Sequence, residues 1–212
     1  MNKIISNRAE IIFLYDIKDG NPNGDPLDEN RPRIDEETGI NIVTDGRLKR
    51  TIRDYLHDFK NQEIFILETR MEDGALKEKE DRLDDLSITT SEELIDKCVD
   101  IRLFGATTLV KKKANMIFTG PVQFKLGRSL HRVVVKFIKG TTVMPSKEQR
   151  KQGTFTETYV LPYSLINFYG IINENSAKET KLTEDDVKLL FDGMWNGTKN
   201  LISRSKAGQM PR

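Results

Sequence analysis

The sequence has 212 residues, of which 37% are hydrophobic and 32% are charged. This hydrophobic fraction can form a core, and the single cysteine, Cys98, excludes an intrachain disulfide and a cysteine-rich zinc cluster. No apolar run approaches the roughly 20 residues of a membrane-spanning helix, and the N-terminal residues lack the apolar centre of a signal peptide. We therefore expect a cytoplasmic protein that has no membrane partner.

The net charge of +1 conceals an uneven distribution along the chain. Residues 1–100 carry 15 basic and 25 acidic side chains, whereas residues 101–153 carry 12 basic side chains and one acid, Glu148. Residues 154–212 carry seven of each kind. This asymmetry indicates a polyanionic partner on the basic segment, with nucleic acid as the first candidate. A solvated basic face explains the same charges about equally well.

The first elements predicted along the chain are a strand, a loop, a helix and a second strand. Residues 10–17 are an apolar run of strand length, and a turn-rich loop follows over 18–43. Apolar residues then recur with helical spacing, which predicts a helix over 45–60 with Thr44 or Asp45 as its N-cap. Residues 63–68 are typical of a strand, so the opening of the chain is predicted to be a βαβ unit.

The middle of the chain, about 70–115, is strongly charged and is predicted to be an exposed insertion. It includes a short helix capped by Ser91, on whose apolar face Cys98 is expected to be buried. Strands are expected at about 116–126, 131–138, 154–161 and 165–172. The polar, basic stretch between the second and third of these strands predicts a long hairpin arm.

The last predicted element is a helix that starts in a capping-box pattern from Thr183 to Asp186. Asn196 and Gly197 could end this helix. Strands and helices therefore alternate as a βαβ opening, several antiparallel strands and a final helix. This order predicts the α+β class, with a ferredoxin-like core that carries insertions.

The basic residues at the start of the helix over 45–60 are the first candidate site, because they lie at the positive end of the helix dipole. Cations are disfavoured there, but together with the free backbone N–H groups they form a good anion site. The residues concerned are Arg47, Lys49, Arg50 and Arg53. Four solvated cations on an outer face are the competing interpretation, and we favour phosphate binding.

The loop before this helix contains Asp19-x-Asn21-x-Asn23-Gly24, which matches the first half of a calcium-binding EF-hand loop. The bidentate glutamate of that motif is replaced by Asn30, so calcium binding is improbable. Asn21 and Asn23 are better explained as turn residues that can meet a phosphate or a ribose.

Acidic residues of the loop and the two histidines are the remaining candidates for metal-binding or catalytic groups. Asp25, Asp28 and Asp45 could gather a divalent metal, but nothing in their spacing requires it. His57 and His131 are far apart in the sequence and have no ligand-like neighbours, so a hydrolase built on them is improbable. We expect no metal and no catalytic residue.

Two further segments combine basic residues with hydrogen-bonding side chains. Residues 120–129 form a basic strand that ends in a glycine turn and carries Gln123, Arg128 and Ser129. Residues 203–209 carry Arg204, Ser205 and Lys206. Each segment is a weak signal by itself, but with the helix they make three segments suited to backbone oxygens of a nucleic acid.

Several motifs occur in order along the chain: NPNGDP, N-x-P-R, T-G-x-x-x-V-T-D-x-x-L-K-R-x-I-R-D-Y, GPVQFxxGRSL, LTEDDVKLLFDGMWNGT and SRSKAGQ. On these motifs the sequence resembles the "Cas-seven" family, the repeated backbone subunits of type I CRISPR surveillance complexes (Cascade). The variety looks like type I-B. The resemblance covers most of residues 11–60, 117–132 and 153–210 and is weak over 61–115 and 139–152.

The resemblance implies a single domain over residues 1–212, with a modified RRM-like (ferredoxin-like) palm. A helical insertion at about 70–115 and a β-hairpin thumb at about 133–158 are implied as well. The implied role is a non-catalytic scaffold without a cofactor. Its implied partners are CRISPR RNA, target DNA through the guide, further copies of itself and other Cascade subunits.

The resemblance also implies the residues that contact RNA phosphates and riboses. These are Asn21, Asn23, Lys49, Arg50, Arg53, Gln123, Arg128, Ser129, Arg204, Ser205 and Lys206. Val143 or Met144 would be the thumb's wedge between bases. Family members usually continue with another palm strand beyond SRSKAGQ, so a C-terminally truncated chain is expected.

An enzyme of the type III kind is the alternative. Related backbone subunits in type III complexes cut target RNA with an aspartate of the corresponding first loop, and Asp25 is the candidate here.

Overall fold

The structure, a computed structural model, describes residues 3–108, 116–141 and 155–212. The chain divides into two compact units, which three elements run through. One, the helical unit, comprises Met1–Ile12, Leu48–Lys125 and Tyr169–Asn200. The other, the sheet unit, comprises Phe13–Arg47, Leu126–Phe168 and Leu201–Arg212. The elements shared by both are β1 (Ala9–Gly20), α1 (Asp45–Lys60) and β11 (Phe155–Ile172).

The sheet unit is built on a mainly antiparallel sheet with the strand order β12-β1-β11-β9-β5-β4. Its further strands are β4 (Ile34–Asp35), β5 (Ile40–Val43), β9 (Gly127–Arg132) and β12 (Met210–Pro211). β2 (Gly24–Asp25) and β3 (Arg31–Pro32) form a separate small hairpin in the first loop. Tyr15 of β1 stacks on Phe168 of β11, with 6.2 Å between the ring centroids. The mixed architecture confirms the predicted α+β class.

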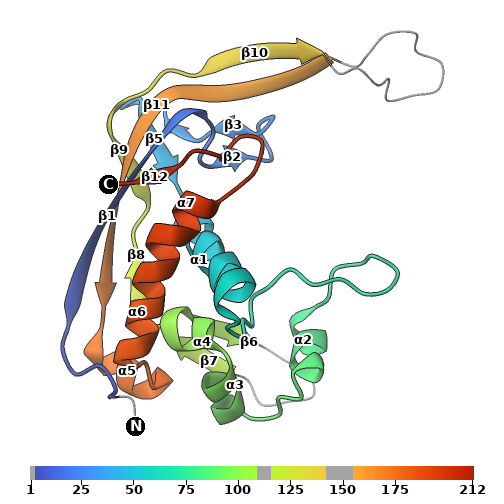
Figure 1. Cartoon of the computed structure of the whole chain (residues 1–212), viewed down its shortest axis with the longest axis vertical. Helices are drawn as coiled ribbons and strands as arrows, with labels where there is room; N and C mark the ends of the chain where they lie inside the picture. Colours follow the sequence, from blue (N-terminus) through green and yellow to red (C-terminus); the bar gives the residue numbers. More distant parts are fainter. Residues whose placement is uncertain (1–2, 109–115, 142–154) are drawn as a thin grey trace. The chain divides into compact units, whose positions relative to one another are not determined.

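A two-stranded arm extends the sheet unit, as Figure 1 shows. β10 (Lys136–Thr141) pairs with the first residues of β11, from Phe155 to Val160, in antiparallel register. The predicted strands at 154–161 and 165–172 are therefore parts of one long strand, and the predicted strand at 131–138 is divided between β9 and β10. The proposed wedge residues Val143 and Met144 lie outside the described residues.

The helical unit contains α2 (Lys79–Asp85), α3 (Ser91–Lys97), α4 (Val99–Phe104), α5 (Glu174–Thr180), α6 (Glu184–Asp192), the π-helical segment η1 (Gly193–Gly197) and α7 (Thr198–Asn200). Its strands are β6 (Gly105–Thr108), β7 (Met116–Thr119) and β8 (Val122–Phe124). β6 pairs with β7, and β8 pairs with the end of β11. None of the described helices combines the length and apolarity that a bilayer crossing requires.

α1 has the bounds that its apolar spacing predicts, and its buried face carries Leu48, Ile52 and Leu56. α6 starts in the predicted capping box between Thr183 and Asp186, whereas α3 is capped by Thr90 and not by Ser91. The predicted end of the last helix at Asn196-Gly197 is wrong, since η1 and α7 continue to Asn200.

The glycines of η1 explain why that helix does not stop where the sequence suggests. A Cβ on Gly193 would lie 2.9 Å from Ile52 Cγ2, and one on Gly197 would lie 3.0 Å from Tyr55 Cβ. These glycines let η1 approach α1 closely, so Gly197 serves helix packing and not helix termination.

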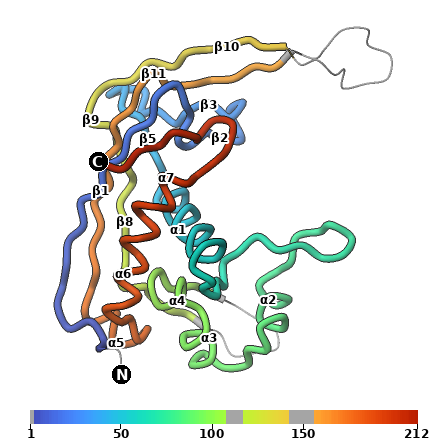
Figure 2. The backbone as a smooth tube through the Cα atoms, viewed as in Figure 1, coloured from blue at the N-terminus to red at the C-terminus, as the bar shows by residue number. Residues whose placement is uncertain are grey.

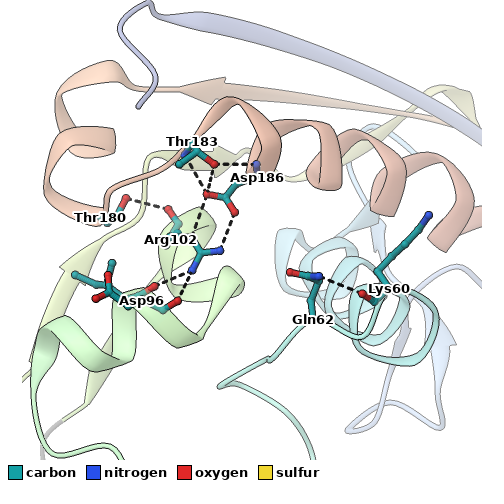
Figure 3. A network of polar contacts seen from close by, with 8 residues as sticks. Lys60, Gln62, Asp96, Arg102, Thr180, Thr183 and Asp186 are labelled. Carbon is teal, nitrogen blue, oxygen red and sulfur yellow. Dashed lines mark hydrogen bonds and ion pairs between the residues drawn. The ribbon is translucent and has the colours of Figure 1, made fainter. Parts of the chain in front are cut away.

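A buried ion pair joins α4 to the start of α6 (Figure 3). Arg102 donates to both carboxylate oxygens of Asp186, at 3.0 and 2.8 Å, and to the carbonyl of Ile95 at 2.8 Å. Asp186 also accepts the hydroxyl of Thr183 at 2.8 Å. The N-cap of α6 is thereby tied to the helices of the insertion.

The predicted strand at 63–68 is wrong, and with it the βαβ opening. The backbone N–H groups of Phe65 and Ile66 donate to the buried carboxylate of Asp100, at 2.8 and 3.1 Å, and not to a neighbouring strand. Arg53 completes this carboxylate's environment, with Nε 2.9 Å from Oδ2. One aspartate from a distant helix therefore satisfies the backbone that a sheet would otherwise have paired.

Replacing Arg53 with Gln is expected to lower the free energy of unfolding by about 3 kcal/mol, because it leaves a buried charge uncompensated. Arg53 is 11% exposed and Asp100 is fully buried. Arg50→Gln, three residues earlier, is the matched control because its ion pair with Asp54 is exposed. The control is expected to change stability by about 0.5 kcal/mol or less. Urea unfolding measures both, and equal losses would contradict this assignment.

Cys98 is buried in a cluster with Phe65, Leu94 and Ile101, which confirms its expected place in a core. Burial, and to a lesser extent the negative charges of Asp100 and Glu63, raises the pKa of its thiol to about 12.

The thiol of Cys98 is therefore expected to resist maleimide at pH 8 in the folded protein, because only the thiolate reacts. Labelling should become fast once urea unfolds the chain. Mass spectrometry over time measures this, and stoichiometric labelling of the folded protein within minutes would show that the cluster opens readily.

Candidate nucleic-acid interface

The first loop and the C-terminal segment, residues 201–209, meet in the sheet unit. The backbone N–H of Asn21 donates to the carbonyl of Ser205 at 2.7 Å. A Cβ on Gly20 would lie only 2.9 Å from the same carbonyl oxygen, so the absence of a side chain permits this approach. Figure 2 shows the two segments, drawn in blue and red, running together there. Two of the predicted RNA-binding segments are thus adjacent, although more than 180 positions separate them in the sequence.

The asparagines of the loop have internal partners. Asn21 is 1% exposed, and its Nδ2 donates to the carbonyl of Asn30 at 2.6 Å. Among the described residues, no donor reaches its Oδ1. Asn23 Oδ1 accepts both the backbone N–H and the hydroxyl of Thr44, at 2.8 and 2.9 Å. Asn21 therefore shapes the loop, and Asn23 fastens it to the start of α1.

The start of α1 belongs to the same group of segments. Thr44 Oγ1 accepts the backbone N–H of Arg47 at 3.2 Å, which confirms Thr44 as one of the two predicted caps. This cap binds the backbone N–H of Arg47, a basic residue that the sequence places in the first turn of the helix.

Positive charge gathers where these segments converge. Partial burial, and then the charge of Arg47, lowers the pKa of Lys206. Two cations are therefore held close enough to disfavour each other's charge. Arg204 is exposed on the same segment, with one guanidinium nitrogen 3.5 Å from Thr156 Oγ1 of β11. A bound polyanion would relieve this repulsion, so the arrangement fits a phosphate site.

The two predicted residues of β9 have different environments. Arg128 is exposed and makes one long contact, 3.4 Å, with Asp35. Ser129 is 4% exposed, and its hydroxyl donates to the carbonyl of His131 at 2.7 Å while accepting the N–H of Asn41 at 2.9 Å. Arg128 can meet a ligand in this conformation, whereas Ser129 holds β5 and β9 together.

The predicted residues of the helical unit likewise divide into exposed and committed side chains. Arg53 is bound to Asp100, and Arg50 Nε donates to both carboxylate oxygens of Asp54 at 2.7 and 2.8 Å. Lys49 lies over the ring of Phe104 at 5.7 Å. Gln123 is exposed on β8, and its Nε2 donates to the carbonyl of Gly120 at 2.9 Å.

The acids of the first loop serve its local structure. Asp25 Oδ2 accepts from Arg33 at 2.8 Å, and Oδ1 accepts the backbone N–H of Leu27 at 3.0 Å. No cluster of three or more His, Cys, Asp or Glu side chains with the spacing of a metal site occurs within the described residues.

One group at the edge of the loop was missed by sequence reasoning: Glu29, Arg31 and Tyr159. Tyr159 OH donates to Glu29 Oε2 at 2.8 Å, and Arg31 donates to both, at 3.0 and 3.1 Å. No local pattern could have shown it, because Tyr159 is 128 positions from Arg31 in the chain.

Comparison with known proteins identifies the family. The family model described as CRISPR-associated protein Cas7 matches residues 7–212. A relative from Haloferax volcanii, also named CRISPR-associated protein Cas7, is 34% identical over an alignment of 236 residues. That alignment covers 97% of this chain and 68% of the relative.

Solved structures show the same fold at low sequence identity. A chain from a "CRISPR RNA-guided surveillance complex, pre-nicking" superposes with a TM-score of 0.62 and 11% identity, over 97% of this chain and 76% of that one. A second chain, from a "CRISPR RNA-guided surveillance complex", gives 0.53 and 16%, over 96% and 66%. With a family model that spans nearly its whole length and a relative above 30% identity, this chain belongs to the Cas7 family of CRISPR-associated proteins.

Proposed function

We propose that this chain is a crRNA-binding backbone subunit of a type I CRISPR Cascade surveillance complex. Several copies would line up along one guide RNA and present it for pairing with target DNA, next to other Cascade subunits. Membership of the Cas7 family supports the role, and so do the related folds found in RNA-guided surveillance complexes. Type I-B and a cytoplasmic location stay predictions.

The observation that carries the proposal is the convergence of the first loop, the start of α1 and the C-terminal segment around Arg47 and Lys206. A backbone hydrogen bond between Asn21 and Ser205 holds the loop to the segment. In this geometry partial burial, and then the charge of Arg47, lowers the pKa of Lys206, so the folded chain holds a disfavoured cation there. Cations and backbone groups of this kind grip phosphates without reading bases, and a guide RNA leaves sequence recognition to base pairing.

The proposed RNA contacts are the predicted residues, sorted by their surroundings. Exposed or partly exposed side chains and backbone would contact RNA directly: Asn23, Lys49, Arg50, Gln123, Arg128, Arg204, Ser205 and Lys206. Asn21, Arg53 and Ser129 have buried internal partners, and we assign them to shaping the interface.

The fold supports an RRM-like palm. In the sheet unit β12 lies beside β1, β1 beside β11 and β11 beside β9, an order in which neighbours in space are distant in the sequence. The β10–β11 arm corresponds in position to the expected thumb at about 133–158, and the elements α2 to β6 lie within the expected insertion at about 70–115.

Lys206→Gln is expected to weaken RNA binding, and to lower the slope of log affinity against log salt by about 0.7 for one lost phosphate contact on a single strand. Its free energy of unfolding should not fall, because the change removes a partly buried charge that Arg47 also repels. Anisotropy of a labelled single-stranded RNA over a salt series, with thermal unfolding alongside, measures both quantities.

Lys188→Gln is the matched control. It removes the same charge from the outer face of α6, where Lys188 pairs with Asp185 at 2.6 Å. Its salt slope should equal that of the wild type. If both variants lost affinity for RNA and salt slope equally, RNA binding would depend on the overall charge of the protein and not on a site at Lys206.

We propose further that the subunit is not an enzyme. Asp25, the candidate of the ribonuclease alternative, holds Arg33 and the turn at Leu27. The expected outcome is that complementary RNA stays intact with the assembled protein and Mg²⁺, as judged by denaturing electrophoresis. Cleavage that disappears in Asp25→Ala, with RNA binding retained, would instead establish the ribonuclease.

A further inference from the structure

The arm formed by β10 and the first residues of β11 is a two-stranded ribbon that needs a second contact to hold its direction. Every described residue of β10 from Lys136 to Lys139 is exposed, and β10 pairs with β11 alone among the described strands. Two-stranded ribbons are weakly stable by themselves and twist readily. The arm's direction therefore depends on what its base contacts in the sheet unit.

The base of the arm contacts the first loop through a closed ring of hydrogen bonds. Tyr159 OH donates to Glu29 Oε2 at 2.8 Å, Arg31 donates to the Tyr159 oxygen at 3.1 Å, and Arg31 donates to Glu29 at 3.0 Å. One nitrogen of Arg31, Nη2, donates to both of the other residues of this triad. The hydrogen bond from Tyr159, and then those from Arg31, lowers the pKa of the Glu29 carboxyl, so the acceptor is the charged form.

Aromatic contacts join the triad to both strands of the arm. The Arg31 guanidinium carbon lies 4.6 Å from the Tyr159 ring centroid, within the range of a cation–π interaction. Tyr159 pairs in register with Phe137 of β10, and their ring centroids are 4.9 Å apart. The Tyr159 side chain therefore contacts both the first loop and the opposite strand of the arm.

The loop meets the triad in an unfavourable backbone conformation. Glu29 and Asn30 have φ angles of 47° and 57°, a region that side-chain-bearing residues rarely adopt. The conformation is held because Asn30 donates its N–H to the carbonyl of Asp25 at 2.8 Å and accepts from Asn21 at 2.6 Å. Gly24 leaves the space beside it, since a Cβ there would lie 2.1 Å from Asn30 Oδ1. Strain kept by so many constraints is typical of functional positions.

The same first loop is bound to the C-terminal segment through Asn21 and Ser205. Arg204 of that segment contacts Thr156, which pairs with Gly140 farther out along the arm than Tyr159. The segments assigned to the RNA thus also contact the arm. We propose that Glu29, Arg31 and Tyr159 form a latch that fixes the direction of the β10–β11 arm. Through this latch the first loop sets where the arm meets the RNA, a consequence that rests on the proposed function.

Spin labels test the latch in the free protein. Lys18→Cys and Glu157→Cys place thiols on exposed positions of β1 and of the arm, while Cys98 stays buried and unlabelled. With Tyr159 unchanged, double electron–electron resonance should give a narrow distribution of distances between the two labels. Adding Tyr159→Phe, which keeps the ring and removes the hydroxyl, should broaden it, and Glu29→Gln should do the same.

Tyr163→Phe is the matched control, since this exposed tyrosine of β11 donates to Asp16 and takes no part in the latch. Its distribution should stay narrow. Narrow distributions in both latch variants, or equal broadening in the control, would overturn the proposal.

Bound RNA tests the consequence. Chemical probing of bases on RNA-loaded protein should give a regular repeat of reactive nucleotides in wild type and Tyr163→Phe. In Tyr159→Phe the pattern of reactive nucleotides should become less regular, while the affinity for RNA stays the same. A tyrosine with a purely structural role would leave this pattern unchanged. A sharp repeat despite a broadened arm would overturn the positioning role. If the wild type binds no RNA, the proposed function fails, and the spin-label distances still decide the latch.

Discussion

A single backbone hydrogen bond, from the N–H of Asn21 to the carbonyl of Ser205, joins the two ends of the candidate interface. It forms at 2.7 Å because Gly20 has no side chain to keep the C-terminal segment away. The segment that it holds in place contains Lys206, whose charge interacts with that of Arg47 at the start of α1. The contact thereby gathers the basic residues of these segments into one site, and charges of one sign that lie together attract a polyanion.

The interface also illustrates how folding and function compete for the same side chains. Partial burial, and then the charge of Arg47, lowers the pKa of Lys206, so the free protein holds a disfavoured cation that a bound anion would stabilise. Elsewhere the chain neutralises its arginines internally, as in the pairs of Arg53 with Asp100 and Arg102 with Asp186. Lys206 and Arg47, whose like charges oppose each other, are therefore the informative cations, and they lie beside the first loop.

Ionic contacts of similar length have different roles in the two units. The pair of Arg53 and Asp100 is buried and satisfies backbone N–H groups, so it belongs to the architecture of the helical unit. The triad of Glu29, Arg31 and Tyr159 is exposed and would contribute little as a simple ion pair. Its three mutual hydrogen bonds and its aromatic contacts with the arm would orient the arm. Its role is therefore to fix a geometry more than to add stability.

The sequence by itself determined what depends on neighbours a few residues away. Helical spacing and a capping residue predicted α1 with its observed bounds, the capping box predicted the start of α6, and the ordered motifs predicted the family. Tertiary structure decided which hydrogen-bonding groups are bound to partners that are distant in the sequence. Asp100 accepts the backbone N–H of Phe65, where a strand was predicted over 63–68, and it also accepts from Arg53. The hydroxyl of Ser129 accepts the backbone N–H of Asn41 in β5. Such choices depend on burial and on residues up to 88 positions away in the chain, and local periodicity contains neither.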